Sequence, residues 1–198
     1  MYEQLIMLDR DLLLAINGFH NHVLDSIMIF ASSKIGWIPL YLILLYIIVK
    51  DYRHSSWVVF LIIGLTIALA DLSSVYLFKN IFQRLRPCYN DELSGLLHIV
   101  KPCGGKFGFI SSHAANSFAF ASLIIFLLRK RHRWIWFVML FYATIIIYSR
   151  VYLGVHYPSD VVAGAIVGGI IGFGCYRLFT ILKVGSKNSL LSKNKDSE

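Results

Sequence analysis

The stretch WVVFLIIGLTIALADLSSVYLF, residues 57–78, decides the fold class of this chain. A helix needs about 20 apolar residues to cross the hydrocarbon core of a bilayer, and the one charged residue in this stretch is Asp71. Four further apolar stretches lie on either side of it, at Val23–Val49, Ser112–Leu128, Trp134–Tyr148 and Asp160–Leu182. We therefore predict an all-α fold, a polytopic membrane bundle with about five to six transmembrane helices.

The composition supports a single membrane-embedded domain over residues 1–182. Hydrophobic residues make up 57% of the chain and charged residues 15%. The net charge is +8, but the Lys and Arg residues lie mainly between apolar stretches, without the interleaved aromatics of a basic soluble module. Topology and anionic lipid explain this charge better than nucleic acid does, so no nucleic-acid partner is expected. The polar residues 183–198 are predicted to form a disordered cytoplasmic tail.

The segment before the first apolar stretch predicts an amphipathic helix over residues 1–20. Apolar residues recur there at helical spacing with charges opposite, at Leu5, Leu8, Leu12, Ile16 and Phe19. We expect this helix to lie on the membrane surface. The stretch Val23–Val49 is interrupted by Ser32, Ser33, Lys34 and Pro39. One kinked helix fits this pattern, and so does a short re-entrant piece followed by a span.

Three basic clusters set the expected orientation. They are Lys50 with Arg53, then Arg129, Lys130, Arg131 and Arg133, and finally the lysines of the tail. Alternating spans place all three on one side, which the positive-inside rule makes cytoplasmic. The loop Gln83–Ile110 and the turn Arg150–Asp160 then lie on the opposite side, where further basic residues break the rule. Those charges are expected to have a role other than topology.

The segment KNIFQRLRP, residues 79–87, places Lys79 and Arg86 seven residues apart. Seven residues is close to two helical turns, so we expect both side chains on one helix face, with Pro87 favouring the end of the helix. Two interpretations are open for this segment. The cations reach toward lipid phosphates at the interface, or they clamp a phosphoryl group, with Arg86 as a planar fork and Lys79 as a point charge.

The segment FISSHAANSFAF, residues 109–120, predicts a helix start. Ser111 and Ser112 precede an apolar run, and serine is a favoured N-cap. The same helix N-terminus is also a ready anion site, and His113 in its first turn would be placed to donate a proton to a leaving oxygen. Capping and phosphate binding are compatible roles for these serines.

The segment SRVYLGVHYPSD, residues 149–160, carries Arg150 and places His156 and Asp160 four residues apart across a turn. A carboxylate beside an imidazole fixes its tautomer and stabilises its cationic form, which is the arrangement of an activated nucleophile or base. The alternative is structural: His156 caps the turn, and Asp160 sits in the first turn of the last helix, where its charge suits the helix dipole.

Taken together, these three segments resemble the three-part signature of the type 2 phosphatidic acid phosphatase superfamily. The resemblance rests on Lys79 with six residues before Arg86-Pro87, on Ser111-Ser112-His113, and on Ser149-Arg150 with five residues before His156 and three more before Asp160. It covers the chain from about Trp57 to Leu182, the expected catalytic core. The middle element usually contains Pro-Ser-Gly-His in this family, whereas this chain has Ile110-Ser111-Ser112-His113.

The resemblance implies a mechanism that needs no metal or other cofactor. His156 would attack phosphorus and form a phosphohistidine, Asp160 would orient it, and His113 would protonate the leaving group. The groups that would hold the phosphoryl oxygens are Lys79, Arg86, Arg150, Ser111 and the backbone N–H groups near Ser112. The sequence agrees, since it offers no carboxylate cluster of the kind a two-metal phosphatase uses.

The resemblance also implies a substrate class and a location. We expect a lipid phosphatase of the bacterial cytoplasmic (inner) membrane with its active site on the periplasmic face, and lipid A as the favoured substrate. Undecaprenyl pyrophosphate and phosphatidylglycerol phosphate are the alternative substrates. A non-catalytic lipid-binding or transport protein is the rival from another class, and haloperoxidase chemistry with vanadate is a second enzymatic rival. The oligomeric state is left open.

Other residues have two interpretations each. Cys88 and Cys103, at the ends of the long loop, form a disulfide or remain two thiols. Asp71, inside a span, makes a polar contact between helices or selects the substrate. Gly164, Gly168 and Gly172 recur every fourth residue and predict close helix packing.

Overall fold

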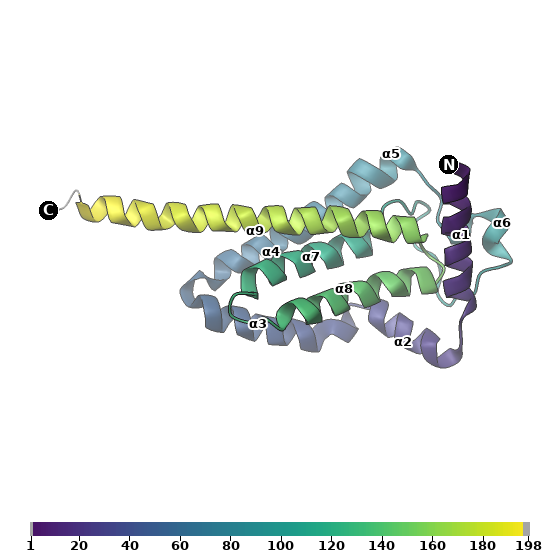
Figure 1. Cartoon of the computed structure of the whole chain (residues 1–198), viewed down its shortest axis with the longest axis horizontal. Coiled ribbons are helices and arrows are strands. Elements are labelled where there is room, and N and C mark those ends of the chain that lie inside the picture. The colour runs from purple at the N-terminus through teal and green to yellow at the C-terminus, as the bar shows by residue number, and fades with distance from the viewer. Residues whose placement is uncertain (1, 196–198) are drawn as a thin grey trace.

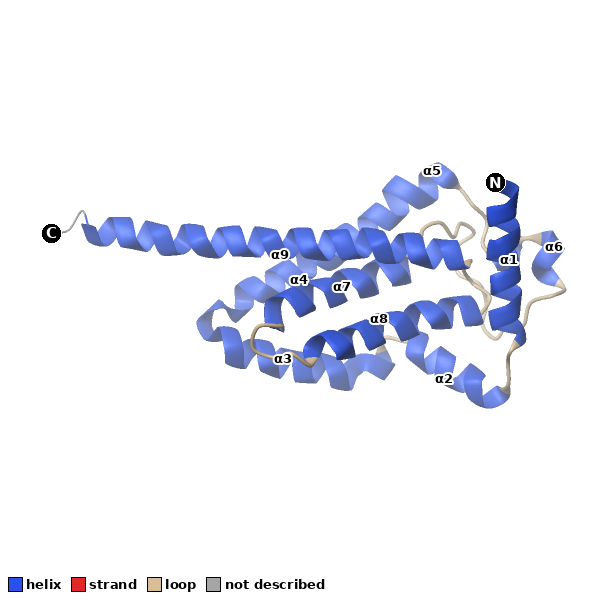
Figure 2. Cartoon of the chain, in the orientation of Figure 1, coloured by secondary structure: helices blue, strands red, loops and turns tan. Residues whose placement is uncertain are grey.

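The computed structural model describes residues 2–195 as a bundle of roughly parallel and antiparallel helices, with one helix lying across an end (Figures 1 and 2). The α-helices are α1 Tyr2–Gly18, α2 His22–Ser32, α3 Ile38–Tyr52, α4 Ser56–Leu72, α5 Asn80–Phe82, α6 Asp91–Ser94, α7 Ser112–Leu128, α8 Ile135–Tyr152 and α9 Pro158–Lys195. Within the described residues there is no β-strand. The predicted all-α membrane bundle is confirmed.

Within residues 2–195, three helical segments are long and apolar enough to cross a membrane, at Ile35–Phe82, Ile135–Tyr152 and Pro158–Leu182. The first of them contains both α3 and α4, which reverse direction at Arg53 (Figure 1). The apolar helices α2 and α7 are shorter. Large apolar side chains cover the outside of the bundle, such as Phe141 at 66% and Ile170 at 66% exposed, as expected for a surface solvated by lipid.

The first apolar stretch divides into two helices. α2 ends at Ser32, a single 3₁₀ turn covers Ile35–Trp37, and α3 starts at Ile38. Pro39 stands in the first turn of α3, where its missing N–H would have no partner within the helix. The structure therefore has the short helix followed by a span rather than one kinked helix.

The centre of the bundle is the contact between α7 and α9. A Cβ added to Gly164 would lie 2.7 Å from the carbonyl oxygen of Ser111, and one on Gly168 or Gly172 would collide with the α7 backbone. On the facing side of α7, Ala115 and Ala119 are fully buried. These glycines therefore let the two backbones approach closely, as the sequence spacing predicts.

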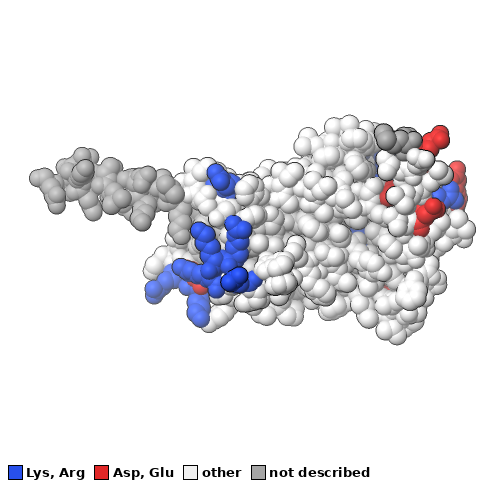
Figure 3. All heavy atoms as spheres, viewed as in Figure 1, with Lys and Arg blue, Asp and Glu red and all other residues white. Residues whose placement is uncertain are grey.

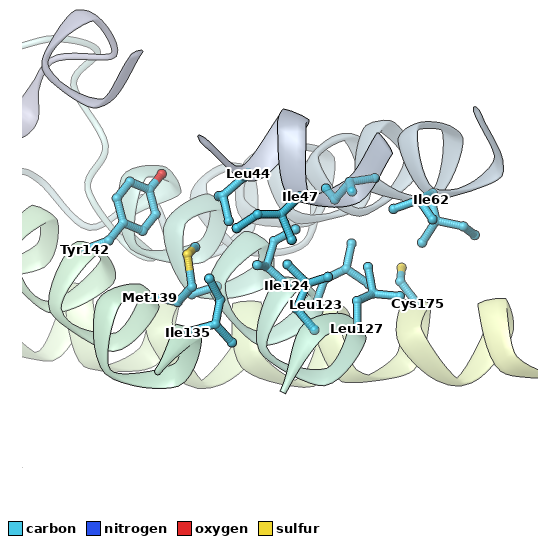
Figure 4. Close-up of a cluster of buried hydrophobic side chains, with 14 of the residues drawn as sticks. Leu44, Ile47, Ile62, Leu123, Ile124, Leu127, Ile135, Met139, Tyr142 and Cys175 are labelled. Atoms are coloured by element: carbon cyan, nitrogen blue, oxygen red, sulfur yellow. The ribbon is translucent and has the colours of Figure 1, made fainter. Parts of the chain in front are cut away.

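A large apolar cluster holds together the half of the bundle near the α3–α4 and α7–α8 connections (Figure 4). Leu44 and Ile47 of α3 and Ile62 of α4 face Leu123 and Ile124 of α7 across this cluster. α8 contributes Ile135, Met139 and Tyr142, and α9 contributes Cys175. The Tyr142 hydroxyl is 3.0 Å from that of Tyr41, so the polar tip of this buried ring is paired.

Helix α1 lies across the end of the bundle and packs through a stripe different from the predicted apolar face (Figure 1). Its protein-facing residues Asp9, Leu13 and Asn17 are at most 7% exposed. In contrast, Leu5 and Phe19 of the predicted face are 61% and 74% exposed, because no described part of the chain covers them. An uncovered apolar face is what a surface-lying helix presents to lipid.

The two ends of the bundle differ in charge (Figure 3). Lys and Arg side chains gather at the end where α3 meets α4 and α7 meets α8, and His132 pairs there with Asp51 at 2.9 Å. Acidic side chains mark the end beside α1 and α6 (Figure 3). α9 stays helical to Lys195, past the boundary at residue 183 where the sequence predicts disorder, while residues 196–198 lie outside the described residues.

We expect Gly168→Leu to destabilise the fold by about 1 to 3 kcal/mol or more, since the added side chain would overpack against the backbone of Ala115. Thermal unfolding of the purified protein in detergent measures this effect. Gly174→Ala on the same helix is the control, because nothing lies within 4 Å of its added Cβ. Equal losses in the two variants would contradict the assigned contact.

Candidate active site

The three sequence segments meet at the end of the bundle beneath α1. Ser111, which precedes α7, donates its backbone N–H to the backbone oxygen of Asp160 in α9 at 3.0 Å. This bond ties the second segment to the third through main chain alone. Lys79 ends the π-helix Ser73–Lys79 that follows α4, Arg150 lies in the last turn of α8, and the positive charges of both act on His156.

His156 and Asp160 form a buried pair, as the spacing predicts. His156 is 1% exposed and Asp160 is fully buried. The His156 Nδ1 atom lies 3.3 Å from Asp160 Oδ2, which also accepts the backbone N–H of Tyr157 at 3.1 Å. Gly108 packs against this carboxylate, and a Cβ at that position would lie 3.0 Å from Asp160 Oδ2. The imidazole is therefore held in one orientation.

Arg86 fixes the tautomer of His156. Its Nη1 atom lies 2.7 Å from His156 Nε2, and a guanidinium donates hydrogen bonds but cannot accept them. Nε2 must therefore carry the lone pair, which leaves Nδ1 to donate its proton to Asp160. Burial lowers the pKa of His156 well below its usual value, and the positive charges of Arg86, Arg150 and Lys79 lower it further. The ring is thus neutral, with a nucleophilic nitrogen facing the cations.

Arg86 reaches this position from a loop and not from the helix that the seven-residue spacing predicted. The α4 helix widens into a π-helix over Ser73–Lys79, and α5 ends at Phe82. Gln83 then turns left-handed with φ 47°, which stops the helix before Pro87 does. The beginning and the end of this loop lie side by side. The Arg86 backbone N–H donates to Lys106 O at 3.1 Å, and the Gly108 N–H donates to Arg84 O at 2.8 Å.

The first turn of α7 carries both serines. Ser111 is the N-cap, and its hydroxyl accepts the backbone N–H of Ala114 at 3.4 Å. Ser112 follows as the first helical residue, and its hydroxyl contacts Lys79 Nζ and lies 2.7 Å from Ser74 Oγ. Ser112, which replaces the glycine of the Pro-Ser-Gly-His element, therefore holds Lys79 in place.

Arg150 has a buried nitrogen atom without a hydrogen-bond partner, and His113 lines an adjoining cavity. Arg150 Nη1 donates to Ser32 Oγ of α2, whereas its Nε atom is buried without a hydrogen-bond partner. A buried donor without a partner costs free energy, so it suits a site that is completed by an anion. A substrate oxygen in this cavity could reach His113.

Two residues that the sequence analysis did not select support the His156–Asp160 pair. Arg84 donates from Nη1 to Asp160 Oδ1 at 2.9 Å and from Nη2 to Asp9 Oδ2 at 2.7 Å. Asp9, in α1, also accepts the backbone N–H of Ser159 at 2.7 Å. Arg84 could have been predicted from its position two residues before Arg86. Nothing local in the sequence indicates that Asp9 reaches α9.

The loop over the site is tied down at several points. Cys88 and Cys103 form a disulfide with their Cα atoms 6.5 Å apart. Asn17 of α1 donates to the backbone oxygens of His98 and Tyr152 at 2.9 and 2.7 Å. His98 in turn lies 3.0 Å from Asp25 of α2. These bonds hold α1, α2 and the loop together around the cationic pocket.

A cavity of 680 Å³ opens beside His113 and continues between the helices. Its lining includes the polar residues Ser32, Lys34, Ser112 and Asn116 together with apolar side chains of α3, α4, α7 and α8. A ligand with a charged head and an apolar body matches this mixed lining. Among the described residues, no three His, Cys, Asp or Glu side chains are grouped to hold a metal ion.

Comparison with known proteins agrees with this geometry. A family model described as the PAP2 superfamily matches residues 57–183. The chain belongs to the PAP2 superfamily. The match covers all three segments of the site, and the resemblance stated from the sequence is confirmed.

Relatives of this PAP2 chain include two enzymes acting on lipid phosphates. A lipid A 4′-phosphatase of Bacteroides thetaiotaomicron is 40% identical over 176 residues, covering 87% of this chain and 77% of that protein. An undecaprenyl-diphosphatase of Sulfolobus acidocaldarius is 30% identical over 174 residues, covering 86% and 78%. Family and relatives together identify a membrane lipid phosphatase.

A solved structure supports the fold. The transmembrane phosphatidylglycerolphosphate phosphatase of Bacillus subtilis has a TM-score of 0.68 to this chain at 20% identity. The similarity covers 89% of this chain and 87% of that one. At this identity the likeness speaks for the shared helical architecture alone.

We expect Asp9→Asn to lower kcat for phosphate release about 10-fold with little change in KM. The substitution removes the charge that holds Arg84 against Asp160, so His156 is less well oriented while the phosphate-binding cations stay in place. Steady-state kinetics of the purified variant measures both constants. Arg10→Gln is the control, because Arg10 makes an exposed ion pair with Glu92 at 3.2 Å. Similar effects of both substitutions, or a change confined to KM, would contradict a positioning role for Asp9.

Proposed function

We propose that this chain removes a phosphate group from lipid A at the periplasmic face of a bacterial inner membrane, through a phosphohistidine on His156. The substrate is favoured by the 40% identity to the lipid A 4′-phosphatase. The basic clusters at the opposite end of the bundle support the orientation, since the positive-inside rule makes that end cytoplasmic.

The observation that carries the proposal is the lone pair on His156 Nε2, which faces a pocket of cations. Arg86 lies 2.7 Å from this nitrogen, and Asp160 holds the opposite side of the ring. A site that only binds phosphate needs cations, but it does not need a buried neutral imidazole oriented by a carboxylate. This pair therefore favours catalysis over a non-catalytic lipid-binding or transport role.

The first chemical step transfers the phosphoryl group to His156. Nε2 forms a bond to phosphorus as the bond from phosphorus to the leaving lipid oxygen breaks, and His113 gives that oxygen a proton. Asp160 stabilises the imidazolium that forms. An incoming phosphate offers Arg86 a charged acceptor in place of Nε2, so the guanidinium moves from the nucleophile to a phosphoryl oxygen.

The remaining cations stabilise charge on the transferring group. Lys79, Arg150 and the N-terminus of α7 at Ser111 and Ser112 surround the place where the three equatorial oxygens would lie, as phosphoryl transfer requires. Water then attacks the phosphohistidine, His113 takes up its proton, and inorganic phosphate leaves. Every step uses side chains of this chain, so we propose hydrolysis without a metal ion.

The apolar cavity beside His113 supports a lipid over a water-soluble ester. Its walls include α3, α4 and α8, which are apolar enough to cross a membrane, so acyl chains could enter while the headgroup phosphate reaches Arg150 and His156. Undecaprenyl pyrophosphate and phosphatidylglycerol phosphate share this amphipathic shape and are the alternative substrates.

We expect His156→Ala to lower phosphate release from lipid A more than about 1,000-fold, because the nucleophile is lost. His113→Ala keeps the nucleophile and should still form the phosphohistidine, but slowly. With a radiolabelled lipid phosphate, this variant should therefore acquire acid-labile label on the protein, whereas His156→Ala should not. His54→Ala, in the turn between α3 and α4, is the matched histidine control. Retained hydrolysis in His156→Ala would exclude the proposed nucleophile.

A phosphate-release panel on the purified protein tests the substrate. Lipid A, undecaprenyl pyrophosphate, phosphatidylglycerol phosphate and phosphatidic acid are compared in mixed micelles with and without EDTA. We expect the highest kcat/KM for lipid A and no loss with the chelator. A higher kcat/KM for another lipid would overturn the proposed substrate, and loss of activity that is restored by a divalent cation would overturn metal independence.

A further inference from the structure

Asp71 of α4 presents a carboxylate to the cavity beside the active site. It lines the cavity together with Asn116 of α7, whose Nδ2 donates to Asp71 Oδ1 at 3.2 Å. No Lys or Arg is ion-paired with Asp71 among the side chains that the structure describes. A carboxylate at this position in a membrane-spanning segment is costly unless it serves a ligand or a partner.

Asn116 adds a second acceptor at the same place. A carboxylate can only accept hydrogen bonds, so the amide must turn its NH₂ group to Asp71 and its oxygen away. That oxygen, Oδ1, is buried and has no hydrogen-bond partner. A contact that served only to join α4 to α7 would be complete without this second acceptor, whereas the observed pair leaves hydrogen-bonding capacity unused.

Asp71 and Asn116 lie about one helical turn from the residues of the candidate phosphate pocket. Asn116 follows His113 by three residues on α7, which corresponds to a rise of about 5 Å along the helix. On α4, the backbone oxygen of Asp71 accepts from Ser74 Oγ at 2.8 Å, and Ser74 Oγ lies 2.7 Å from Ser112 Oγ. Since Ser112 also holds Lys79, the acceptor pair and the phosphate-binding lysine belong to one connected network.

We propose that Asp71 and Asn116 are specificity residues that accept hydrogen bonds from a hydroxyl or amide N–H group of the lipid headgroup. The donor would lie about one helical turn from the phosphate, which suits an amino sugar or a glycerol headgroup. The proposal rests on the lipid phosphatase function proposed above and goes further by naming the headgroup feature that is recognised. Phosphatidic acid and simple aryl phosphates offer no such donor.

The chemistry makes this recognition selective. An acceptor such as the Asp71 carboxylate loses its water when a substrate fills the cavity and must regain a hydrogen bond, so a substrate without the donor leaves it unpaired. Sites built to bond a substrate hydroxyl therefore discriminate strongly against analogues that lack it. An apolar wall at the same place could not distinguish these lipids.

The test compares two classes of substrate on the full chain in mixed micelles. Lipid A and phosphatidylglycerol phosphate carry a donor near the phosphate, whereas phosphatidic acid and p-nitrophenyl phosphate do not. We expect Asp71→Ala and Asn116→Ala each to lower kcat/KM about 10- to 100-fold for the first class and less than about 3-fold for the second. The control is Ile67→Ala, one turn away on α4 and lining the same cavity. It should change kcat/KM for lipid A and for phosphatidic acid by the same factor.

The second substrate class also guards against misfolding. A variant that fails to fold loses p-nitrophenyl phosphate hydrolysis as well, and Asp71→Asn, which keeps the shape of the side chain and one acceptor, should retain part of the selectivity. Equal losses on both classes in Asp71→Ala, Asn116→Ala and Asp71→Asn would overturn the specificity role and leave a structural contact. Wild-type protein without activity on lipid A, but with preserved selectivity for phosphatidylglycerol phosphate, would overturn the proposed substrate and keep the inference.

Discussion

The close contact between α7 and α9 is the constraint on which the site depends. Glycines on α9 let its backbone meet that of α7, and the resulting approach brings Ser111 within hydrogen-bonding distance of Asp160. The start of α7 and the start of α9, with His156 in the turn just before α9, thus lie side by side. Bulkier residues along the contact would separate the two helix ends and, with them, His113 from the His156–Asp160 pair.

The second governing feature is the way in which charge is balanced around one neutral imidazole. Arg86 and Arg150 raise the positive potential that a phosphate needs, and the same potential keeps His156 unprotonated. Arg84 supplies the ion pair of the buried Asp160 carboxylate, and Arg84 is in turn paired with Asp9. Ion pairs therefore run from Asp9 of the surface helix α1 through Arg84 to Asp160, whose Oδ2 atom lies 3.3 Å from the neutral ring of His156.

The sequence predicted those parts of the molecule that local patterns encode. Four of the five apolar stretches correspond closely to helices, and the fifth contains the turn that Ser32 and Pro39 indicated. The seven-residue spacing of Lys79 and Arg86 gave the wrong geometry, because a π-helix and the left-handed Gln83 intervene. Asp9 was missed because its partners are far away in sequence, and such pairings depend on how α1 settles across the bundle.

The candidate site and the cavity beside it are built from different parts of the fold. The His156–Asp160 pair lies where α7 and α9 share a backbone hydrogen bond and a close helix interface. Helices α3 and α4 line much of the adjoining cavity, and on its other side α4 packs Ala70 against Ala115 and Ala119 of α7. Substitutions of the cavity-lining side chains on α3 and α4 can therefore change the space for a ligand while leaving the α7–α9 contact intact. A fold organised in this way lets one reaction be reused for membrane lipids as different as a glycolipid and an isoprenoid.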